Sequence, residues 1–309
     1  GLSQVAAWQS EHNSTSPVAL GQCVTLLRVS HRFAGHSGIG QLAKAVHQGK
    51  GELALTLFST MPGELTHHRI TAEQTCSTAA WQSILEPVLT SSPSTGWQPW
   101  LDLVRSAPKL RFGEVQHDAA FDAWGRAVLQ AFAHLQWLSP LRRGPWGVEG
   151  LNDWMMGWLR KSMGVVGRPS PWVEGRPLMV THNEPSLGLM NGDVGILLDV
   201  GAADAPDLRA VFKRADGSLR WLKPTALPEV DTAFCLTVHK SQGSEFNHAV
   251  LVMPPQNSPV LTRELFYTAV TRAKSKFTLV SADPTVVMRC IARSAERAGG
   301  LNEGLQRLT

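Results

Sequence analysis

Cysteine is scarce in this sequence, and its positions exclude the usual cysteine-based sites. Cys23, Cys76, Cys235 and Cys290 lie far apart along the 309 residues, whereas zinc sites use pairs of Cys or His residues a few positions apart. Disulfide frameworks are typical of short secreted chains rather than of a chain this long. The sequence therefore predicts buried, reduced thiols and no bound metal ion.

Long hydrophobic runs are missing as well. No apolar stretch is long enough to cross a bilayer, and no signal peptide is recognisable at the start of the chain. We therefore expect a soluble, cytoplasmic protein without membrane contacts. The formal net charge of +4 is compatible with binding to nucleic acid, but ordinary enzymes also carry such a charge.

A third absence concerns nucleotide chemistry. The chain has no glycine-rich loop ending in Gly-Lys-Thr or Gly-Lys-Ser, the loop that cradles nucleotide phosphates. The nearest segment, Gln48-Gly49-Lys50-Gly51, lacks the spaced first glycine and the hydroxyl. No acidic pair follows an apolar strand to hold Mg²⁺. No cluster of nucleophile, acid and base stands out either, which argues against a small-molecule enzyme.

Hydrophobic periodicity predicts an α/β fold before residue 164. A strand, a loop bearing an arginine and an amphipathic helix follow one another, as in α/β units. The region from about 52 to 137 is expected to be mainly helical, although it is poorly defined. The expected elements are a strand at Cys23–Leu27 and helices at Ile39–Val46, Ala119–Trp137 and Leu151–Met163.

Between about 165 and 229 the pattern changes to short strands separated by turns, which predicts a small all-β module. Its strands are expected at Pro177–Thr181, Gly195–Val200, Leu208–Phe212 and Arg220–Leu222, with hairpin signals at Asn191-Gly192-Asp193 and Ala215-Asp216-Gly217. An α/β pattern returns with strands at Phe234–Val238, His248–Met253 and Phe277–Ser281 and a helix at Thr262–Ala273. We therefore predict one domain from residues 1–164 and 230–309 and an inserted module at 165–229.

The turn after the expected strand at Phe234–Val238 carries most of the polar chemistry. His239 to Gly243 would present hydrogen-bond donors at the carboxyl edge of a sheet, where ligands of open α/β sheets bind. Gly243 permits close approach of the backbone to a phosphate, and Glu245 is placed to hold a ribose hydroxyl. The same pattern also fits a polar turn whose glycine serves only the backbone geometry.

Arg272 is the candidate for stabilising charge on a transferred phosphoryl group. A lone arginine at the end of a helix is more often a plain surface residue. Arg32 follows the first expected strand and offers a second guanidinium for the same phosphate chain. The pair therefore favours the functional interpretation.

These segments resemble the fifth and sixth motifs of superfamily-one helicases, specifically those of the RecD family, the alpha subunits of exodeoxyribonuclease V. Thr237–Phe246 and Arg263–Ala273 carry the resemblance. Further stretches resemble the same family: Ser30–Phe33 with Ser37–Ala43, Arg143–Val148 with Leu151 and Asn152, and Glu174–Val180 with Gly188–Gly195. The similarity covers nearly the whole chain and thins between about 52 and 115.

The resemblance implies a second RecA-like motor domain, a parallel sheet flanked by helices, with an inserted SH3-like β-module. Arg32 and Arg272 would reach the γ-phosphate of ATP. The phosphate and ribose side of ATP would be met by Gln242, Gly243 and Glu245. The residues on the side of the DNA would be Thr237, His239, Lys240, Asn152 and Trp221.

Eleven tryptophans also suggest stacking on DNA bases. Three lie on apolar helical faces, where core packing is the better explanation: Trp124, Trp154 and Trp158. Three others are the candidates for contact with DNA or a partner: Trp146, Trp172 and Trp221.

The implied function is ATP-dependent 5′-to-3′ unwinding of DNA in double-strand break repair and recombination. Single-stranded DNA and the RecB and RecC subunits would be the partners, in the bacterial cytoplasm.

ATP and Mg²⁺ would need the phosphate loop and acidic residues of a first RecA-like domain, which this sequence lacks. Because the chain also starts on Gly1 rather than methionine, we expect a fragment that is inactive alone and binds ATP weakly. A stand-alone RecD-like helicase and a non-catalytic module that binds DNA or protein remain the alternatives.

Overall fold

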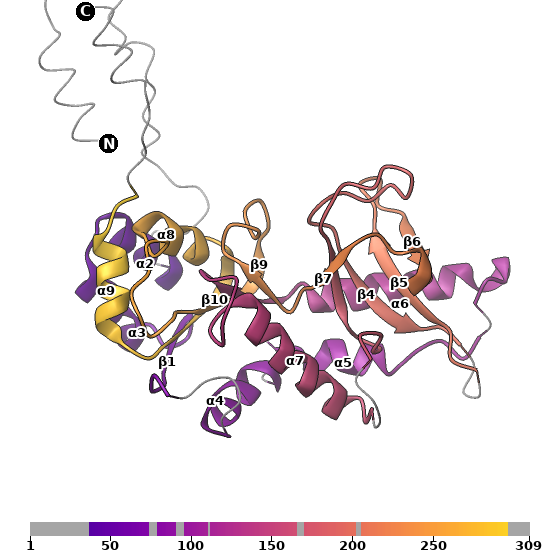
Figure 1. Cartoon of the computed structure of the whole chain (residues 1–309), viewed down its shortest axis with the longest axis horizontal. Coiled ribbons are helices and arrows are strands. Elements are labelled where there is room, and N and C mark those ends of the chain that lie inside the picture. Colours follow the sequence, from indigo (N-terminus) through magenta and orange to yellow (C-terminus); the bar gives the residue numbers. More distant parts are fainter. Residues whose placement is uncertain are drawn as a thin grey trace, which may run out of the picture. The chain divides into compact units, whose positions relative to one another are not determined.

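Two five-stranded sheets, one parallel and one antiparallel, organise the molecule (Figure 1). The computed structural model describes residues 37–73, 79–90, 96–110, 112–165, 170–201 and 205–295. All of them belong to one compact unit, His36–Thr309. The expected strand at Cys23–Leu27 and the candidate Arg32 lie outside the described residues.

The parallel sheet has the strand order β1-β10-β9-β2-β8. Its strands are β1 (Leu65–Arg69), β2 (Leu135–Ser139), β8 (Cys235–Thr237), β9 (Phe246–Val252) and β10 (Ala273–Ser281). The inner strands are largely buried: β2 at every position, β9 at all but Asn247, and β10 from Phe277 to Ser281. Burial of this kind is expected where a parallel sheet is covered on both faces.

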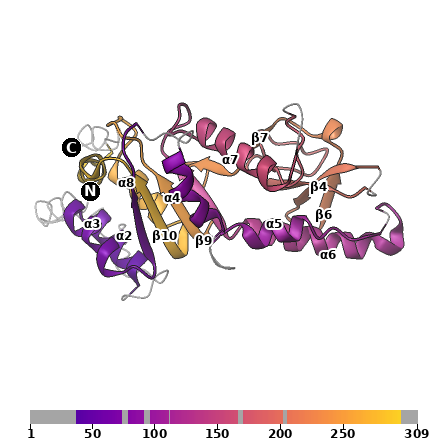
Figure 2. The same ribbon diagram turned by 90° about the horizontal axis from the view of Figure 1, so that it is seen from below.

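Two groups of helices accompany these strands (Figure 2). One group packs around β1, β9 and β10: α2 (Gly38–His47), α3 (Gly51–Thr60), α8 (Arg263–Val270) and α9 (Pro284–Ala292). The other group consists of α4 (Ala79–Thr90), α5 (Gln98–Val104), α6 (Val115–Phe132) and α7 (Val148–Ser162). Helix α8 begins where the Thr262 hydroxyl accepts a hydrogen bond from the Leu265 N–H at 3.3 Å, a typical N-cap. None of the helices in the described part of the chain is both long and apolar enough to cross a membrane.

Two details of residues 52–137 differ from the expected elements: one strand was not expected, and one helix is shorter than expected. β1 is a strand within the region expected to be mainly helical, and α6 ends at Phe132 instead of continuing to Trp137. The next strand, β2, begins at Leu135, and its buried side chains do not alternate with polar ones. A short apolar run of this kind has no period that distinguishes a buried strand from a helix. Pairing with β8 and β9 decides its structure.

The antiparallel sheet has the strand order β6-β5-β4-β3-β7. Its strands are β3 (Pro177–Val180), β4 (Val194–Asp199), β5 (Leu208–Lys213), β6 (Leu219–Leu222) and β7 (Val230–Thr232). The first four confirm the expected strands to within about one residue at each end. The two turn glycines have left-handed backbones, with φ of 94° at Gly192 and 82° at Gly217, as hairpin turns require.

Strand β7 was not expected, and it extends the antiparallel sheet to Thr232. It pairs with β3 and follows the short 3-10 helix η2 (Pro224–Ala226). The sheet therefore continues three residues beyond the predicted module boundary at 229, and only Ala233 and Phe234 separate it from β8. The division into domains itself stays a prediction.

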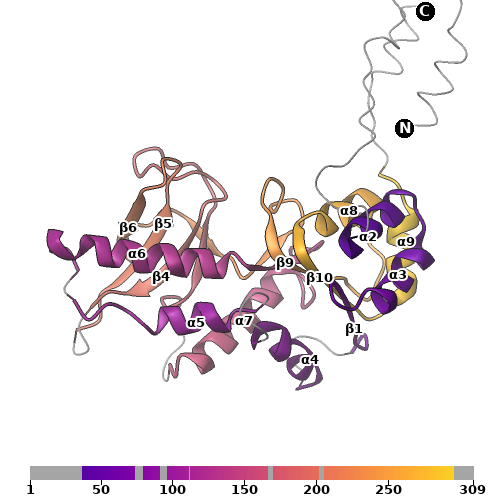
Figure 3. The same cartoon turned by 180° about the vertical axis from the view of Figure 1, so that it is seen from behind.

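One cluster of buried apolar side chains is shared by both sheets, and the antiparallel sheet has a second cluster of its own. The shared cluster includes Trp97, Trp100 and Trp137 near the parallel strands and Ile196 and Val211 of the antiparallel sheet. Helix α6 contacts β4, β5 and β6 (Figure 3). The antiparallel sheet is thus packed on the helices that follow β1 rather than hanging free of them.

Candidate nucleotide and nucleic-acid sites

The segment between β8 and β9 leads from the carboxyl edge of the parallel sheet, where the strands end, to the amino edge, where they begin. β8 ends at Thr237 and β9 begins at Phe246. Since both strands run parallel to β2 between them, the end of one and the start of the other lie at opposite edges. Ser241 anchors the intervening turn, because its hydroxyl donates to the Val238 carbonyl at 2.8 Å and is buried.

Gly243 lies in this turn with φ of 89°, a conformation that favours glycine. An added Cβ would meet no atom within 4 Å. The backbone geometry alone therefore accounts for the glycine, and the open space beside it also leaves room for a phosphate. Gln242 is exposed in the same turn.

Arg272 and Glu245 lie together at the amino edge of the sheet. Each immediately precedes a strand, and the first residues of those strands, Ala273 and Phe246, are register partners. The Arg272 guanidinium donates to the Ser244 carbonyl at 2.9 Å. Glu245 Oε2 lies 3.6 Å from Lys274 Nζ. The expected carboxyl-edge position concerned His239 to Gly243, whereas Glu245, at the end of the turn, lies at the amino edge beside Arg272.

Three hydrogen bonds hold the Arg272 side chain in place. Besides Ser244, it donates to the Thr268 carbonyl at 3.1 Å and to the Thr271 hydroxyl at 3.3 Å. Carbonyl and hydroxyl oxygens that accept from a guanidinium fix its orientation. Helix α8 and the turn thus present a fixed positive group beside Glu245.

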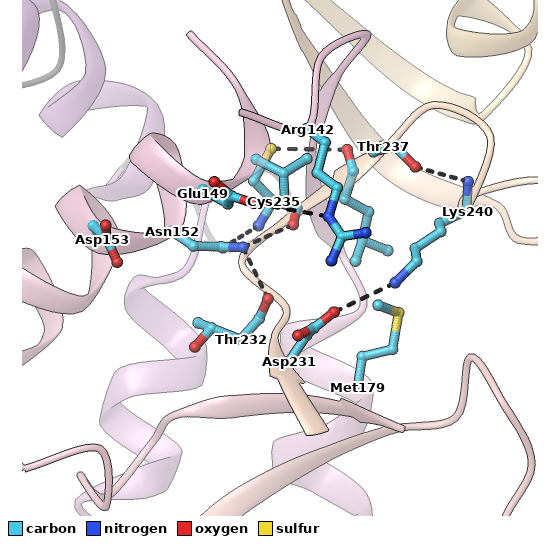
Figure 4. A pocket seen from close by; sticks show the side chains of 12 residues that line it. Arg142, Glu149, Asn152, Asp153, Met179, Asp231, Thr232, Cys235, Thr237 and Lys240 are labelled. Carbon is cyan, nitrogen blue, oxygen red and sulfur yellow. Dashed lines mark hydrogen bonds and ion pairs between the residues drawn. The ribbon is translucent and has the colours of Figure 1, made fainter. Parts of the chain in front are cut away.

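A pocket of about 350 Å³ lies at the opposite, carboxyl end of β8 (Figure 4). It is lined by side chains from α7, from both sheets and from the turn: Arg142, Val148, Glu149, Asn152, Asp153, Met179, Asp231, Thr232, Cys235, Leu236, Thr237 and Lys240. Three of the expected DNA-side residues, Thr237, Lys240 and Asn152, therefore meet in one place. His239 is exposed next to Lys240 but does not line the pocket.

The two cations of the pocket are each paired with a carboxylate. Lys240 Nζ lies 3.4 Å from Asp231 Oδ2, and Arg142 Nε lies 3.7 Å from Glu149 Oε1. The Thr237 hydroxyl accepts from the Lys240 N–H at 3.2 Å. Hydroxyl, amide and ammonium groups suit contacts with phosphate and sugar. Within the described ranges, no group of three His, Cys, Asp or Glu side chains is placed to hold a metal ion.

Asn152 ties the pocket wall together. Its Oδ1 accepts from the Cys235 N–H at 2.8 Å, and its Nδ2 donates to the carbonyls of Thr232 at 2.8 Å and Cys235 at 3.1 Å. The side chain is buried and joins α7 to β7 and β8. Both amide hydrogens are used within the protein, so a role of Asn152 in DNA binding stays a prediction that requires these bonds to rearrange.

The tryptophan candidates lie in different surroundings. Trp146 is buried edge-on against Trp81, 5.4 Å between ring centroids, so the expectation that it is open for contact is wrong. Trp221 is half-buried against α6, where its indole N–H donates to Asp122 at 2.9 Å. Its contact with DNA stays a prediction. Trp172 is 38% exposed, with the Arg176 guanidinium 5.9 Å from its ring.

Sequence reasoning missed Arg142, Glu149 and Asp231, which line the pocket. Arg142 adjoins a stretch that the helicase resemblance had singled out, so its neighbourhood was a usable signal. Asp231 had none, because its place depends on β7 returning beside β3 and ending next to β8.

The turn that joins the pocket to Arg272 lies in a segment of the chain that is similar to helicases. The family described as UvrD-like helicase C-terminal domain matches residues 232–280, from the end of β7 into β10. RecBCD enzyme subunit RecD of Haemophilus influenzae is 31% identical over 287 residues, 93% of this chain and 41% of the relative. The same subunit of Mycobacterium tuberculosis is 36% identical over 290 residues, 92% and 43% of the two chains.

The chain is thus a homologue of the RecD subunit and corresponds to the C-terminal portion of that protein. It spans less than half the length of these relatives. The ATP-dependent RecD2 DNA helicase of Deinococcus radiodurans is 32% identical over 147 residues, 46% of this chain and 19% of the relative. Among solved structures, a Pif1 helicase from Bacteroides in complex with ADP-AlF3 and ssDNA has a TM-score of 0.37 at 12% identity, covering 88% of this chain and 53% of that one.

Proposed function

We propose that the chain is the second motor domain of an ATP-dependent 5′-to-3′ DNA helicase subunit of the RecBCD type, acting in double-strand break repair and recombination. One observation carries the proposal. The single turn between β8 and β9 starts at the pocket, beside Thr237 and Lys240, and ends beside Arg272. A shift of this turn on nucleotide binding would therefore move groups at the DNA side, as coupling of hydrolysis to stepping requires.

On the nucleotide side, Arg272 is proposed to stabilise charge on the γ-phosphate of ATP. A guanidinium already oriented by carbonyl and hydroxyl groups needs little reorganisation when the charge develops. Gln242, Gly243 and Glu245 would meet the phosphates and ribose, and Arg32 would supply a second guanidinium. A first RecA-like domain would bring the phosphate loop and Mg²⁺.

The test is Arg272→Ala in the natural-length protein that contains this chain. We expect DNA-stimulated ATP turnover to fall about 10³-fold or more, as for other arginines that act on a transferred phosphoryl group. Arg105→Ala is the control, since Arg105 is an exposed arginine at the C-cap of a different helix, α5, and is paired with Asp102. Unchanged turnover in the Arg272 variant would remove Arg272 from the proposed mechanism.

On the DNA side, the pocket at the carboxyl end of β8 is proposed to contact single-stranded DNA, with the antiparallel module forming part of the same path. The module would be SH3-like. Its strand order β6-β5-β4-β3-β7, with the 3-10 helix η2 before the returning strand β7, supports this interpretation. Trp172, exposed beside Arg176, offers a surface on which a base could stack.

The partners are proposed to be the RecB and RecC subunits. A stand-alone helicase is the second candidate, because part of the chain is also similar to an ATP-dependent RecD2 DNA helicase. Co-purification of the tagged natural-length protein distinguishes the two. RecB and RecC in stoichiometric amounts support the complex, whereas DNA-stimulated unwinding by the protein alone supports the second candidate.

A further inference from the structure

Lys240 and Asp231 form an ion pair across the junction of the two sheets. Lys240 Nζ lies 3.4 Å from Asp231 Oδ2, and Figure 4 shows the two side chains directed toward each other. Asp231 belongs to β7 of the antiparallel sheet, and Lys240 to the turn after β8 of the parallel sheet. The pair therefore links the module to the turn that also leads to Arg272.

The backbone on both sides of the pair is fixed, whereas the pair itself is loosely held. Asp231 is in register with Met179 of β3, and the Lys240 N–H donates to the Thr237 hydroxyl. The two side chains remain 43% and 47% exposed. Exposed ion pairs contribute little to stability, so a better anion can replace the carboxylate without unfolding the site.

A phosphodiester is such an anion. It carries a single negative charge on oxygens that accept hydrogen bonds from an ammonium group, as a carboxylate does. We propose that the Asp231 carboxylate occupies the position of a DNA backbone phosphate in the DNA-free protein, and that single-stranded DNA binds by displacing Asp231 from Lys240. This inference rests on the proposed DNA path through the pocket.

The second ion pair of the pocket, Arg142–Glu149, does not link the two sheets. Glu149 lies in the first turn of α7, where the helix N-terminus stabilises a carboxylate whether or not Arg142 is near. Its N–H also donates to the Arg142 carbonyl at 3.0 Å, so that pair is local. Asp231 belongs instead to a strand, β7, and reaches across to the turn after β8.

Asp231 keeps a cationic neighbour when it leaves Lys240. Arg176 donates to the Thr232 hydroxyl at 3.1 Å. Burial lowers the pKa of Arg176, and the charge of Asp231 acts in the opposite direction. Asp231 therefore remains in the favourable field of Arg176 when its pair with Lys240 opens.

The test measures binding of a fluorescein-labelled oligo-dT strand to the full chain by anisotropy, at several salt concentrations. Asp231→Asn should bind about two- to fivefold more tightly than wild type at low salt, the range expected for loss of an exposed ion pair that competes with the ligand. Lys240→Ala should bind more weakly and reduce the slope of log affinity against log salt by about 0.7. Asp102→Asn is the matched control, since Asp102 also lies 3.4 Å from its cation, Arg105, but lines no part of the pocket.

The double variant separates displacement from a general charge effect. If Asp231 competes with DNA for Lys240, then adding Asp231→Asn to Lys240→Ala should increase the DNA affinity no more than the control Asp102→Asn does. The inference is overturned if the wild-type chain binds DNA but Asp231→Asn does not bind it more tightly. It is also overturned if Asp231→Asn increases the affinity as much in the Lys240→Ala background as in wild type. Both outcomes leave the proposed DNA path intact. No binding by the wild-type chain overturns both the inference and the DNA path. Equal melting temperatures of the variants exclude a folding artefact.

Discussion

Gly125 is the residue that allows β6 to lie close to α6. A Cβ at this position would lie 2.8 Å from Trp221 Cζ2 and 3.2 Å from Leu219 Cδ1. The indole cannot swing away easily, because Asp122 accepts its N–H and Trp124 stacks on it with 6.3 Å between ring centroids. The absent side chain therefore sets the contact between the helix and the module.

We expect Gly125→Ala to lower the free energy of unfolding by about 1–3 kcal/mol, the usual cost of overpacking a core contact. The control is Gly157→Ala in α7, where an added Cβ meets nothing within 4 Å. That change should be neutral or stabilise by about 0.5–1 kcal/mol, because alanine favours the helix. Urea denaturation of both variants measures the difference. Equal stability of the two would show that α6 and Trp221 do not pack in this way.

At the residue scale, the sequence predicts site residues that share one motif but not those that distant segments bring together. Thr237 and Lys240 were found because they belong to one contiguous motif. Asp231, their counterpart in the pocket, lies in a strand whose return to β3 could not be foreseen from local pattern. The arginine and lysine beside Trp221 in the sequence make it a candidate for DNA contact but do not indicate that its indole N–H donates to Asp122 of α6, about a hundred residues earlier. Contacts between distant segments decide both cases.

At the scale of elements, a strand could be predicted where glycine or proline residues mark the turns at its ends. The strands of the module were located because turns with glycines at positive φ bound them. β2 was missed because its five buried residues follow α6 after only two residues, without a glycine or proline between them. The family resemblance implied a parallel sheet, but neither it nor the α/β pattern gave the place of each strand in that sheet.

Glu174 joins two strands of the module and should make its stability depend on pH. The carboxyl group precedes β3 and accepts the Asp199 N–H of β4 at 3.4 Å. Burial, together with the charge of Asp199, raises the pKa of Glu174 from 4.5 to about 7. Because the folded-state pKa is the higher one, its contribution to stability is fully present below about pH 4.5 and is lost as the pH rises through about 7.

We expect Glu174→Gln to remove this loss. A shift of this size corresponds to about 3 kcal/mol without screening, which solvent contact reduces to roughly 1–2 kcal/mol. Unfolding free energies at pH 5 and pH 8 should therefore differ less in the variant than in wild type. Burial lowers the pKa of His67 to about 4, which acts in the opposite direction in both proteins and cancels in the comparison. An unchanged pH dependence, with exposed Glu52→Gln as reference, would contradict the burial of Glu174.

At the scale of the whole molecule, this chain is proposed to supply only part of a nucleotide site, and the phosphate-binding part must come from another domain. Arg272 offers a fixed positive charge, and Glu245 lies beside it. The sequence contains no loop of the Gly-Lys-Thr or Gly-Lys-Ser type to hold phosphates. An arginine that stabilises charge in a transition state contributes only when another part of the protein holds the nucleotide and its metal ion in place.

We therefore expect the purified chain to show no DNA-stimulated ATP hydrolysis above that of its own Arg272→Ala variant, in a coupled assay with Mg²⁺ and oligo-dT. The natural-length protein that contains it should hydrolyse ATP under the same conditions and lose this activity with Arg272→Ala. Using the same variant in both backgrounds distinguishes a contaminating ATPase, which the substitution leaves unchanged, from true turnover. Arg272-dependent hydrolysis by the chain alone would mean that it holds ATP without a second domain, and the composite site proposed for this family of motors would not apply to it.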